Sequence, residues 1–99
     1  MFLWIHKIVE DLPIKVLVKQ EILDDINRLP SDLGDRIKTA LKELEISWPI
    51  CRLDIKKLKG YPNHYRIRVG DYRILFFHES GIAKVYNVSH RSDSYKRRT

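Results

Sequence analysis

The chain has 99 residues and a formal net charge of +6, because 19 lysines and arginines outnumber 13 aspartates and glutamates. Its hydrophobic fraction of 43% excludes a disordered tail, and no apolar run approaches the length of a membrane-spanning helix. The single cysteine, Cys51, excludes an internal disulfide and suits a reducing cytosol, so we expect a cytoplasmic protein. A small basic domain of this kind binds nucleic acid, an anionic membrane surface or an acidic protein.

Residues 1–13 are rich in apolar side chains and end at Pro13. Three interpretations are open: one face of a short helix, a loose cover over the domain, or a stretch upstream of the domain's natural start. We favour the short helix, as an N-terminal extension to a single domain that spans residues 14–99. The opening apolar run is too short to form the core of a signal peptide.

A first strand and two amphipathic helices come next. Residues 14–18 are β-branched or aliphatic with one lysine, which predicts the strand. Residues 20–29 predict a helix that stops at Pro30, with an apolar stripe formed by Ile22, Leu23, Ile26 and Leu29. Ser31 or Asp32 is the candidate N-cap of a second helix, whose stripe consists of Leu33, Ile37, Leu41 and Leu44. Two such helices joined by a few residues predict an antiparallel pair that covers a sheet.

The segment after Trp48-Pro49 is basic and only weakly periodic, with cationic side chains at Arg52, Lys56, Lys57 and Lys59. We interpret it as a connection that has room for a short strand. Pro62-Asn63 then turns the chain into the next element.

Residues 65–77 alternate apolar side chains with arginines, turn at Gly70-Asp71, and then run apolar. Alternation is the period of a half-buried strand, and Gly-Asp between two such runs signals a two-residue hairpin loop. This loop places Arg68 opposite Arg73 and Ile67 opposite Ile74. One face then carries Arg66, Arg68 and Arg73, and the other carries Ile67, Val69, Tyr72 and Ile74.

The opposed arginines are a functional clue. Like charges directly opposite each other destabilise a sheet, so folding alone does not favour this pair, whereas a polyanion on that face would neutralise it. The hairpin therefore indicates phosphate binding. The alternative is the solvated outer face that any antiparallel sheet presents.

Glu79-Ser80-Gly81 predicts the next turn, and residues 82–88 predict the last strand. The basic tail from His90 to Arg98 suits a terminal turn of helix capped by Ser92. The chain as a whole predicts an α+β fold, with a helical hairpin packed on one face of a mostly antiparallel sheet of about four strands.

Three motifs stand in a fixed order: Lys57-Leu58-Lys59-Gly60, the hairpin from Tyr65 to Ile74, and Val88-Ser89-His90-Arg91-Ser92-Asp93-Ser94-Tyr95. Together they resemble the RelE branch of the RelE/ParE toxin superfamily, over about Lys15 to Tyr95. The hairpin occurs throughout that superfamily, so the ending His-Arg-x-Asp-x-Tyr is the more informative motif for activity.

The resemblance implies the toxin of a type II toxin–antitoxin system, an endoribonuclease that cleaves mRNA in the ribosomal A site without a metal or other cofactor. It implies as partners the mRNA and ribosome, a cognate antitoxin protein, and operator DNA bound through the antitoxin complex, with no membrane. The histidines fit this picture, since His6, His64 and His78 have no carboxylate or cysteine at ligand spacing and so predict no metal site.

Two groups of site residues follow from the family motifs and from the charges around them. The expected catalytic residues are Arg73, Arg91, Tyr95 and His90. The expected RNA- and phosphate-binding residues are Arg66, Arg68, Lys57, Lys59 and Lys96.

RNA cleavage through the 2′-hydroxyl needs a base, an acid and cations around the phosphorane. The arginines supply the cations, but an arginine effectively cannot lose its proton. Some relatives carry lysines where this chain has Arg66 and Arg68, so we expect His90 to act as the base instead, because histidine is the usual general base in proteins. Tyr95 is expected either to stack on a base or to transfer a proton.

Two other functions remain open. A ParE-like inhibitor of DNA gyrase would share the fold but lack the RNA-cleaving residues, and the joint presence of Arg73, Arg91 and Tyr95 counts against it. A non-catalytic family member that binds only its antitoxin is compatible with arginines at the two lysine positions.

Overall fold

A computed structural model describes residues 14–48 and 52–92 of the chain. Their elements are, in order, β1 (Lys15–Val18), α2 (Gln20–Arg28), α3 (Ser31–Ser47), β2 (Asp54–Lys57), β3 (His64–Val69), β4 (Tyr72–Glu79) and β5 (Ile82–His90). The short helix expected within residues 1–13 lies outside the described residues.

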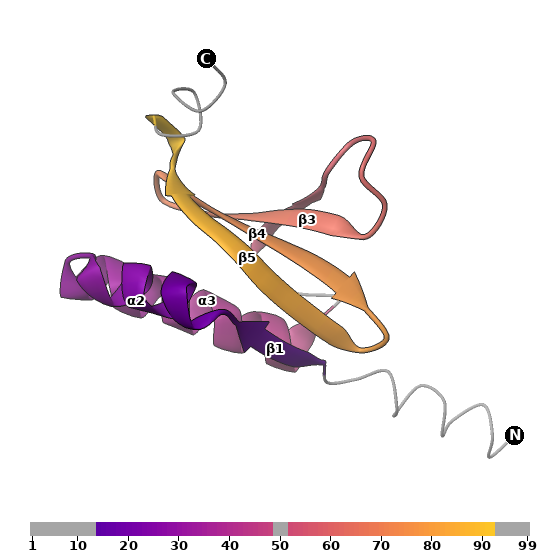
Figure 1. Cartoon of the computed structure of the whole chain (residues 1–99), viewed down its shortest axis with the longest axis horizontal. Coiled ribbons are helices and arrows are strands. Elements are labelled where there is room, and N and C mark those ends of the chain that lie inside the picture. The colour runs from indigo at the N-terminus through magenta and orange to yellow at the C-terminus, as the bar shows by residue number, and fades with distance from the viewer. Residues whose placement is uncertain (1–13, 49–51, 93–99) are drawn as a thin grey trace, which may run out of the picture.

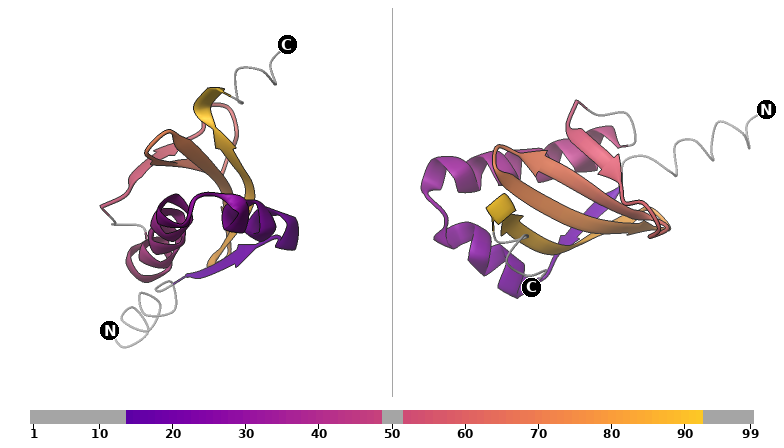
Figure 2. Two further views of the ribbon diagram at one scale, coloured as in Figure 1. Left: turned by 90° about the vertical axis from the view of Figure 1, so that its left-hand side faces the viewer. Right: turned by 90° about the horizontal axis from the view of Figure 1, so that it is seen from above.

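The strands form one sheet in the order β1-β5-β4-β3-β2. β1 runs parallel to β5, and the other neighbouring strands are antiparallel. Helices α2 and α3 lie together on one side of this sheet (Figures 1 and 2). The predicted α+β fold, with a helical hairpin on one face of a mostly antiparallel sheet, is therefore confirmed. In the part of the chain that the structure describes, neither helix is long and apolar enough to cross a membrane.

The sheet has five strands rather than about four, and the additional strand is β2. β2 lies at the sheet edge and pairs Ile55 with Ile67 and Lys56 with Arg66. The lysines of β2 interrupt the apolar alternation by which a strand is predicted from sequence. Charged residues are common in edge strands, because they protect the edge from further pairing.

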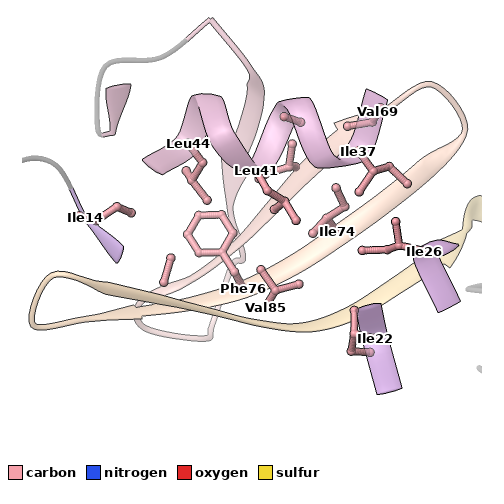
Figure 3. Close-up of a cluster of buried hydrophobic side chains, with 13 residues drawn as sticks. Ile14, Ile22, Ile26, Ile37, Leu41, Leu44, Val69, Ile74, Phe76 and Val85 are labelled. Atoms are coloured by element: carbon pink, nitrogen blue, oxygen red, sulfur yellow. The ribbon is translucent and has the colours of Figure 1, made fainter. Parts of the chain in front are cut away.

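The hydrophobic core lies between the helices and the sheet (Figure 3). The helices contribute Ile26, Ile37 and Leu44, and the hairpin strands contribute Ile74 and Phe76; all five side chains are fully buried. The two helices approach closely at one glycine of α3: a Cβ on Gly34 would lie 3.1 Å from the backbone oxygen of Ile26.

The expected N-cap of α3 is wrong by one residue. The helix begins at Ser31, and Pro30 occupies the N-cap position with extended backbone angles and no capping side chain. The Pro30 carbonyl accepts the N–H of Gly34 at 3.0 Å, which is the first bond of the helix. Asp32 still contributes, because its carboxylate lies in the first turn, at the positive end of the helix dipole.

The hairpin of β3 and β4 has the predicted register. Arg68 pairs with Arg73, and Ile67 pairs with Ile74, around a turn in which Gly70 adopts a φ of 59°. Alternation therefore places the apolar residues toward the helices and places Arg66, Arg68 and Arg73 together on the opposite face, as predicted. We call this opposite face of β3, β4 and β5 the arginine face.

Candidate functional site

Three arginines from two distant parts of the chain meet at one end of the arginine face. Arg68 and Arg73 come from the hairpin, and Arg91 follows β5; together with the turn residues Gly70, Asp71 and Tyr72 they line a small pocket of about 40 Å³. Within the described residues none of the three arginines forms an ion pair. We call this site the arginine pocket. Asp71 is the one acidic residue of the lining, so three guanidinium groups leave an excess of positive charge that suits an anion.

Arg91 is brought to the pocket by its own backbone. Its N–H donates to the carbonyl oxygen of Asp71 at 2.9 Å, which ties the end of β5 to the hairpin turn. This contact involves no side chain, so it holds position 91 beside the turn whatever residue stands there. Among residues 14–48 and 52–92 the guanidinium has no ion-pair partner, so it is available to a ligand there.

Arg66 lies further along the arginine face and has an unmet donor. Only 12% of its side chain is exposed, and its Nη1 is buried with no hydrogen-bond acceptor. Its Nη2 lies 3.8 Å from Oδ1 of Asp54, too long for a hydrogen bond. A buried guanidinium nitrogen without a partner is costly, so this group would gain from a phosphate or carbonyl oxygen of a ligand.

His90 lies on the other face of the sheet. Because β5 pairs Ser89 with Arg73 and His90 with Tyr72, the imidazole points away from the arginine face and lies edge-on to the Tyr72 ring, with centroids 5.2 Å apart. His90 Nδ1 accepts the backbone N–H of Ser92 at 3.2 Å and lies 2.8 Å from the Ser92 hydroxyl. Ser92 was predicted to cap a terminal turn of helix, but Arg91 and Ser92 are themselves helical, and the capping side chain is that of His90.

This contact decides which nitrogen of His90 can act as a base. A backbone N–H only donates, so Nδ1 is the acceptor and the ring proton of a neutral His90 is on Nε2. The nitrogen that could take a proton from RNA is therefore engaged with Ser92. The general-base role of His90 stays a prediction, and the geometry weighs against it.

The predicted lysines are not part of the arginine pocket. Lys57 pairs with Tyr65, so its side chain belongs to the helix side of the sheet. Lys59 lies in the turn after β2, and both lysines are exposed. Sequence reasoning did not assign Lys56, which pairs with Arg66 and shares the arginine face. Recognition of β2 as a strand would have identified it by alternation. Tyr95 and Lys96 lie outside the described residues.

No group of three or more histidine, cysteine, aspartate or glutamate side chains in the described ranges 14–48 and 52–92 is placed to hold a metal ion. The positive charges that the site offers to a ligand in these ranges are guanidinium and ammonium groups.

Comparison with protein families matches residues 16–95 to the family described as "ParE toxin of type II toxin-antitoxin system, parDE". The match spans far more than half of the chain. The chain belongs to the RelE/ParE superfamily of type II toxins. The relatives from this superfamily that are reported below carry the name RelE.

Toxin RelE3 of Methanocaldococcus jannaschii is 45% identical over 62 residues, which are 61% of this chain and 70% of the relative. The toxin in a crystal structure of a RelB–RelE antitoxin–toxin complex from Methanococcus jannaschii is 33% identical, with a TM-score of 0.67 over 82% of this chain and 96% of that one. An archaeal RelE–RelB complex from Pyrococcus horikoshii has the same fold, with a TM-score of 0.69 at 24% identity over 81% of this chain and 97% of that one.

Proposed function

We propose that this toxin is an endoribonuclease that cleaves mRNA in the ribosomal A site without a metal cofactor, in the cytoplasm. The observation that supports the proposal is the arginine pocket, where Arg68, Arg73 and Arg91 come together and outnumber the one carboxylate of the lining, Asp71. A guanidinium donates two parallel hydrogen bonds to a phosphate, which fixes both its position and its orientation. Identity to relatives named RelE supports the same branch of the superfamily.

The reaction that suits such a pocket is attack by a ribose 2′-oxygen on the adjacent phosphorus. The new P–O2′ bond forms as the P–O5′ bond breaks, which yields a 2′,3′-cyclic phosphate and a 5′-hydroxyl. The 2′-hydroxyl gives its proton to a base, and the departing 5′-oxygen receives one from an acid. The phosphorane carries more negative charge than the starting diester, so preorganised cations around it lower the barrier.

Within this proposal Arg73 and Arg91 contact the scissile phosphate, while Arg66 and Arg68 hold the RNA backbone. Arginines do not serve as the base, because they keep their protons. With the accepting nitrogen of His90 bound to Ser92, we assign the proton transfers to Tyr95 or to a group of the ribosome.

We also propose that a cognate antitoxin silences this toxin by covering the arginine face or by packing beside it. The structures of related toxins described above are complexes of RelE with RelB. A net charge of +6 and the excess of arginines over carboxylates in the pocket make an acidic partner favourable here. Binding of operator DNA through the antitoxin complex belongs to the same proposal.

One assay separates the candidate functions. The purified protein is added to translating ribosomes programmed with a defined message and, separately, to DNA gyrase with supercoiled DNA. We expect cleavage of the message in the A site and intact DNA. Gyrase-dependent DNA breaks would instead establish a ParE-like activity. A folded protein that causes neither kind of cleavage would support the third candidate, a non-catalytic family member that binds only its antitoxin.

A further inference from the structure

A second cluster of side chains lies at the opposite end of the arginine face from the pocket. The His64 ring is surrounded by three aromatic rings: Tyr61 with centroids 6.1 Å away, Phe77 at 4.9 Å and Tyr86 at 5.5 Å. His64 Nδ1 also lies 2.9 Å from the Tyr86 hydroxyl. We call these four residues the His64 cluster.

The cluster is not part of the hydrophobic core. In β3, His64 alternates with Arg66 and Arg68, so all three side chains emerge on the face that the helices leave uncovered. His64 pairs with Phe77, just as Arg68 pairs with Arg73. The loop that carries Tyr61 rises from the sheet on the side away from the helices (Figure 1). Rings gathered on an uncovered face indicate a binding surface.

Tyr86 reaches this cluster through an irregularity in the sheet. The pairing of β4 with β5 shifts between Leu75, which pairs with Asn87, and Phe76, which pairs with Val85. Tyr86 is therefore the extra residue of a β-bulge. Such bulges re-aim side chains and are frequent beside functional sites. Here the bulge lets Val85 enter the core while Tyr86 contacts His64 on the other face.

The cluster has both exposed aromatic surface and positive charge. Tyr61 is 62% exposed and lines a pocket of about 290 Å³ together with Lys57, which pairs with Tyr65 and so belongs to the helix side of β2. Lys84 is exposed and pairs with Phe77, so it projects from the same face. Single-stranded nucleic acid is bound by this combination, in which rings stack on bases and cations follow the backbone.

We propose that the His64 cluster is a nucleobase-stacking site that holds a base of the single-stranded mRNA beside the cleavage point. The proposal rests on the proposed function, because it places the scissile phosphate in the arginine pocket. His64 lies four positions before Arg68 in β3, a distance of about 13 Å along the strand. A base at the cluster therefore belongs to a neighbouring nucleotide and not to the one whose phosphate lies in the pocket.

Within the cluster the residues have different duties. Tyr61 is the outermost ring and offers its face to a base. Burial raises the pKa of the Tyr86 phenol, so its hydroxyl keeps its proton and can hold the His64 ring by donating to Nδ1. Nε2 then carries the ring proton of His64 and is a donor for an acceptor on the base edge.

The test uses a short single-stranded oligoribonucleotide that contains 2-aminopurine, whose fluorescence is quenched by stacking, with a 2′-deoxy sugar at the cleavage point to prevent reaction. The full-length protein is expected to quench the fluorescence. Tyr61→Ala is expected to lose the quenching and to bind about 5- to 50-fold more weakly. Tyr61→Phe keeps the ring and is expected to recover most of the binding.

Ile46→Ala is the matched control, because Ile46 is 70% exposed on α3, away from the arginine face. Loss of an exposed side chain there should change neither signal. Tyr61 is itself exposed and contributes only backbone hydrogen bonds to its turn, so its replacement should not unfold the protein.

The outcomes separate this inference from the proposed function. Cleavage of ribosome-bound message by the parent, with no quenching and no effect of Tyr61→Ala on RNA binding, overturns the stacking site and leaves the endoribonuclease standing. Quenching that Tyr61→Ala abolishes, in a protein that cuts no message, supports the stacking site and contradicts the proposed reaction. An effect of Tyr61→Ala on antitoxin binding alone would assign the cluster to the antitoxin and overturn the proposal.

Discussion

Ile67 and Ile74 oppose each other across β3 and β4 and are fully buried against the helices, whereas Arg68 and Arg73 oppose each other one position further on, on the other face. The isoleucine pair stabilises the fold through apolar burial. The two arginines repel each other, and Asp54, which faces Arg68 from β2, offsets part of that repulsion. The comparison teaches that alternate residues of the same two strands serve stability and ligand binding separately, so changes on each face should have different consequences.

Phe76→Ala should have the largest effect on stability. Phe76 is fully buried on the helix side of β4, beside Val85 in the core (Figure 3). Loss of such a ring leaves a cavity, so the free energy of unfolding should fall by about 3–5 kcal/mol. Urea titration followed by circular dichroism measures it. The exposed Ile46→Ala should change stability by less than about 0.5 kcal/mol, and equal losses in the two variants would refute the assignment of the core face.

His90→Gln should affect cleavage much less than loss of a general base would. The Nδ1 of His90 is engaged with Ser92 on the face opposite the arginines. We expect the single-turnover rate to fall by less than about tenfold, against the 10²–10⁴ that a general base typically contributes. The pH dependence of the rate should keep its shape. If the cleavage rate of the parent changed with pH near neutrality and that of His90→Gln did not, His90 would again be the candidate base.

Arg68→Gln should weaken RNA binding while it leaves the stability of the fold almost unchanged. The substitution removes the like-charge repulsion with Arg73 and also the attraction to Asp54, which faces Arg68 from β2. The two losses offset each other, so the free energy of unfolding should change by less than about 0.5 kcal/mol. Arg28→Gln is a suitable control, because Arg28 is an exposed arginine of α2 that pairs with Asp25 instead of another cation. A larger decrease in stability on Arg68→Gln would show that the arginine pair is held by interactions that the fold needs.

Asp54→Asn should have the smallest effect, in the direction of tighter RNA binding. The Asp54 carboxylate lies 3.8 Å from the Arg66 guanidinium and competes with phosphate for it. Neutralising a half-exposed partner should tighten binding of single-stranded RNA by about 1.5- to 5-fold. Asp25→Asn removes a carboxylate from a matched pair on α2 and should leave RNA binding unchanged. Weaker binding by the Asp54 variant would mean that Asp54 positions Arg66 for the ligand.

The hairpin was predictable from sequence because its determinants are local. A two-residue loop at Gly70-Asp71 fixes the register, and the period of two then assigns each side chain of β3 and β4 to a face. The apolar stripes of the helices were predictable for the same reason. Ile26 belongs to the stripe of α2, and Ile37 and Leu44 belong to that of α3; all three are buried as expected.

The remaining features depend on pairing between distant strands. β2 has lysines where a pattern search expects apolar residues, and only its register with β3 shows that Lys56 joins the arginine face. β5 was expected to stop at Val88 but continues to His90, and this continuation puts the imidazole on the helix side. The bulge at Tyr86 has no sequence signal, because an extra residue in one strand is defined only by its partner strand.

The most direct test of the division between the two faces is single-turnover cleavage of ribosome-bound message by Arg73→Ala and Arg91→Ala, with unfolding measured on the same preparations. Removing either cation from the phosphorane should lower the rate by about 10²–10³, while the free energy of unfolding holds or rises slightly. Arg91→Ala keeps the backbone hydrogen bond from position 91 to the Asp71 carbonyl. The control is Arg28→Ala on α2, which should cleave at the parental rate. Full activity in both Arg73→Ala and Arg91→Ala would contradict the account.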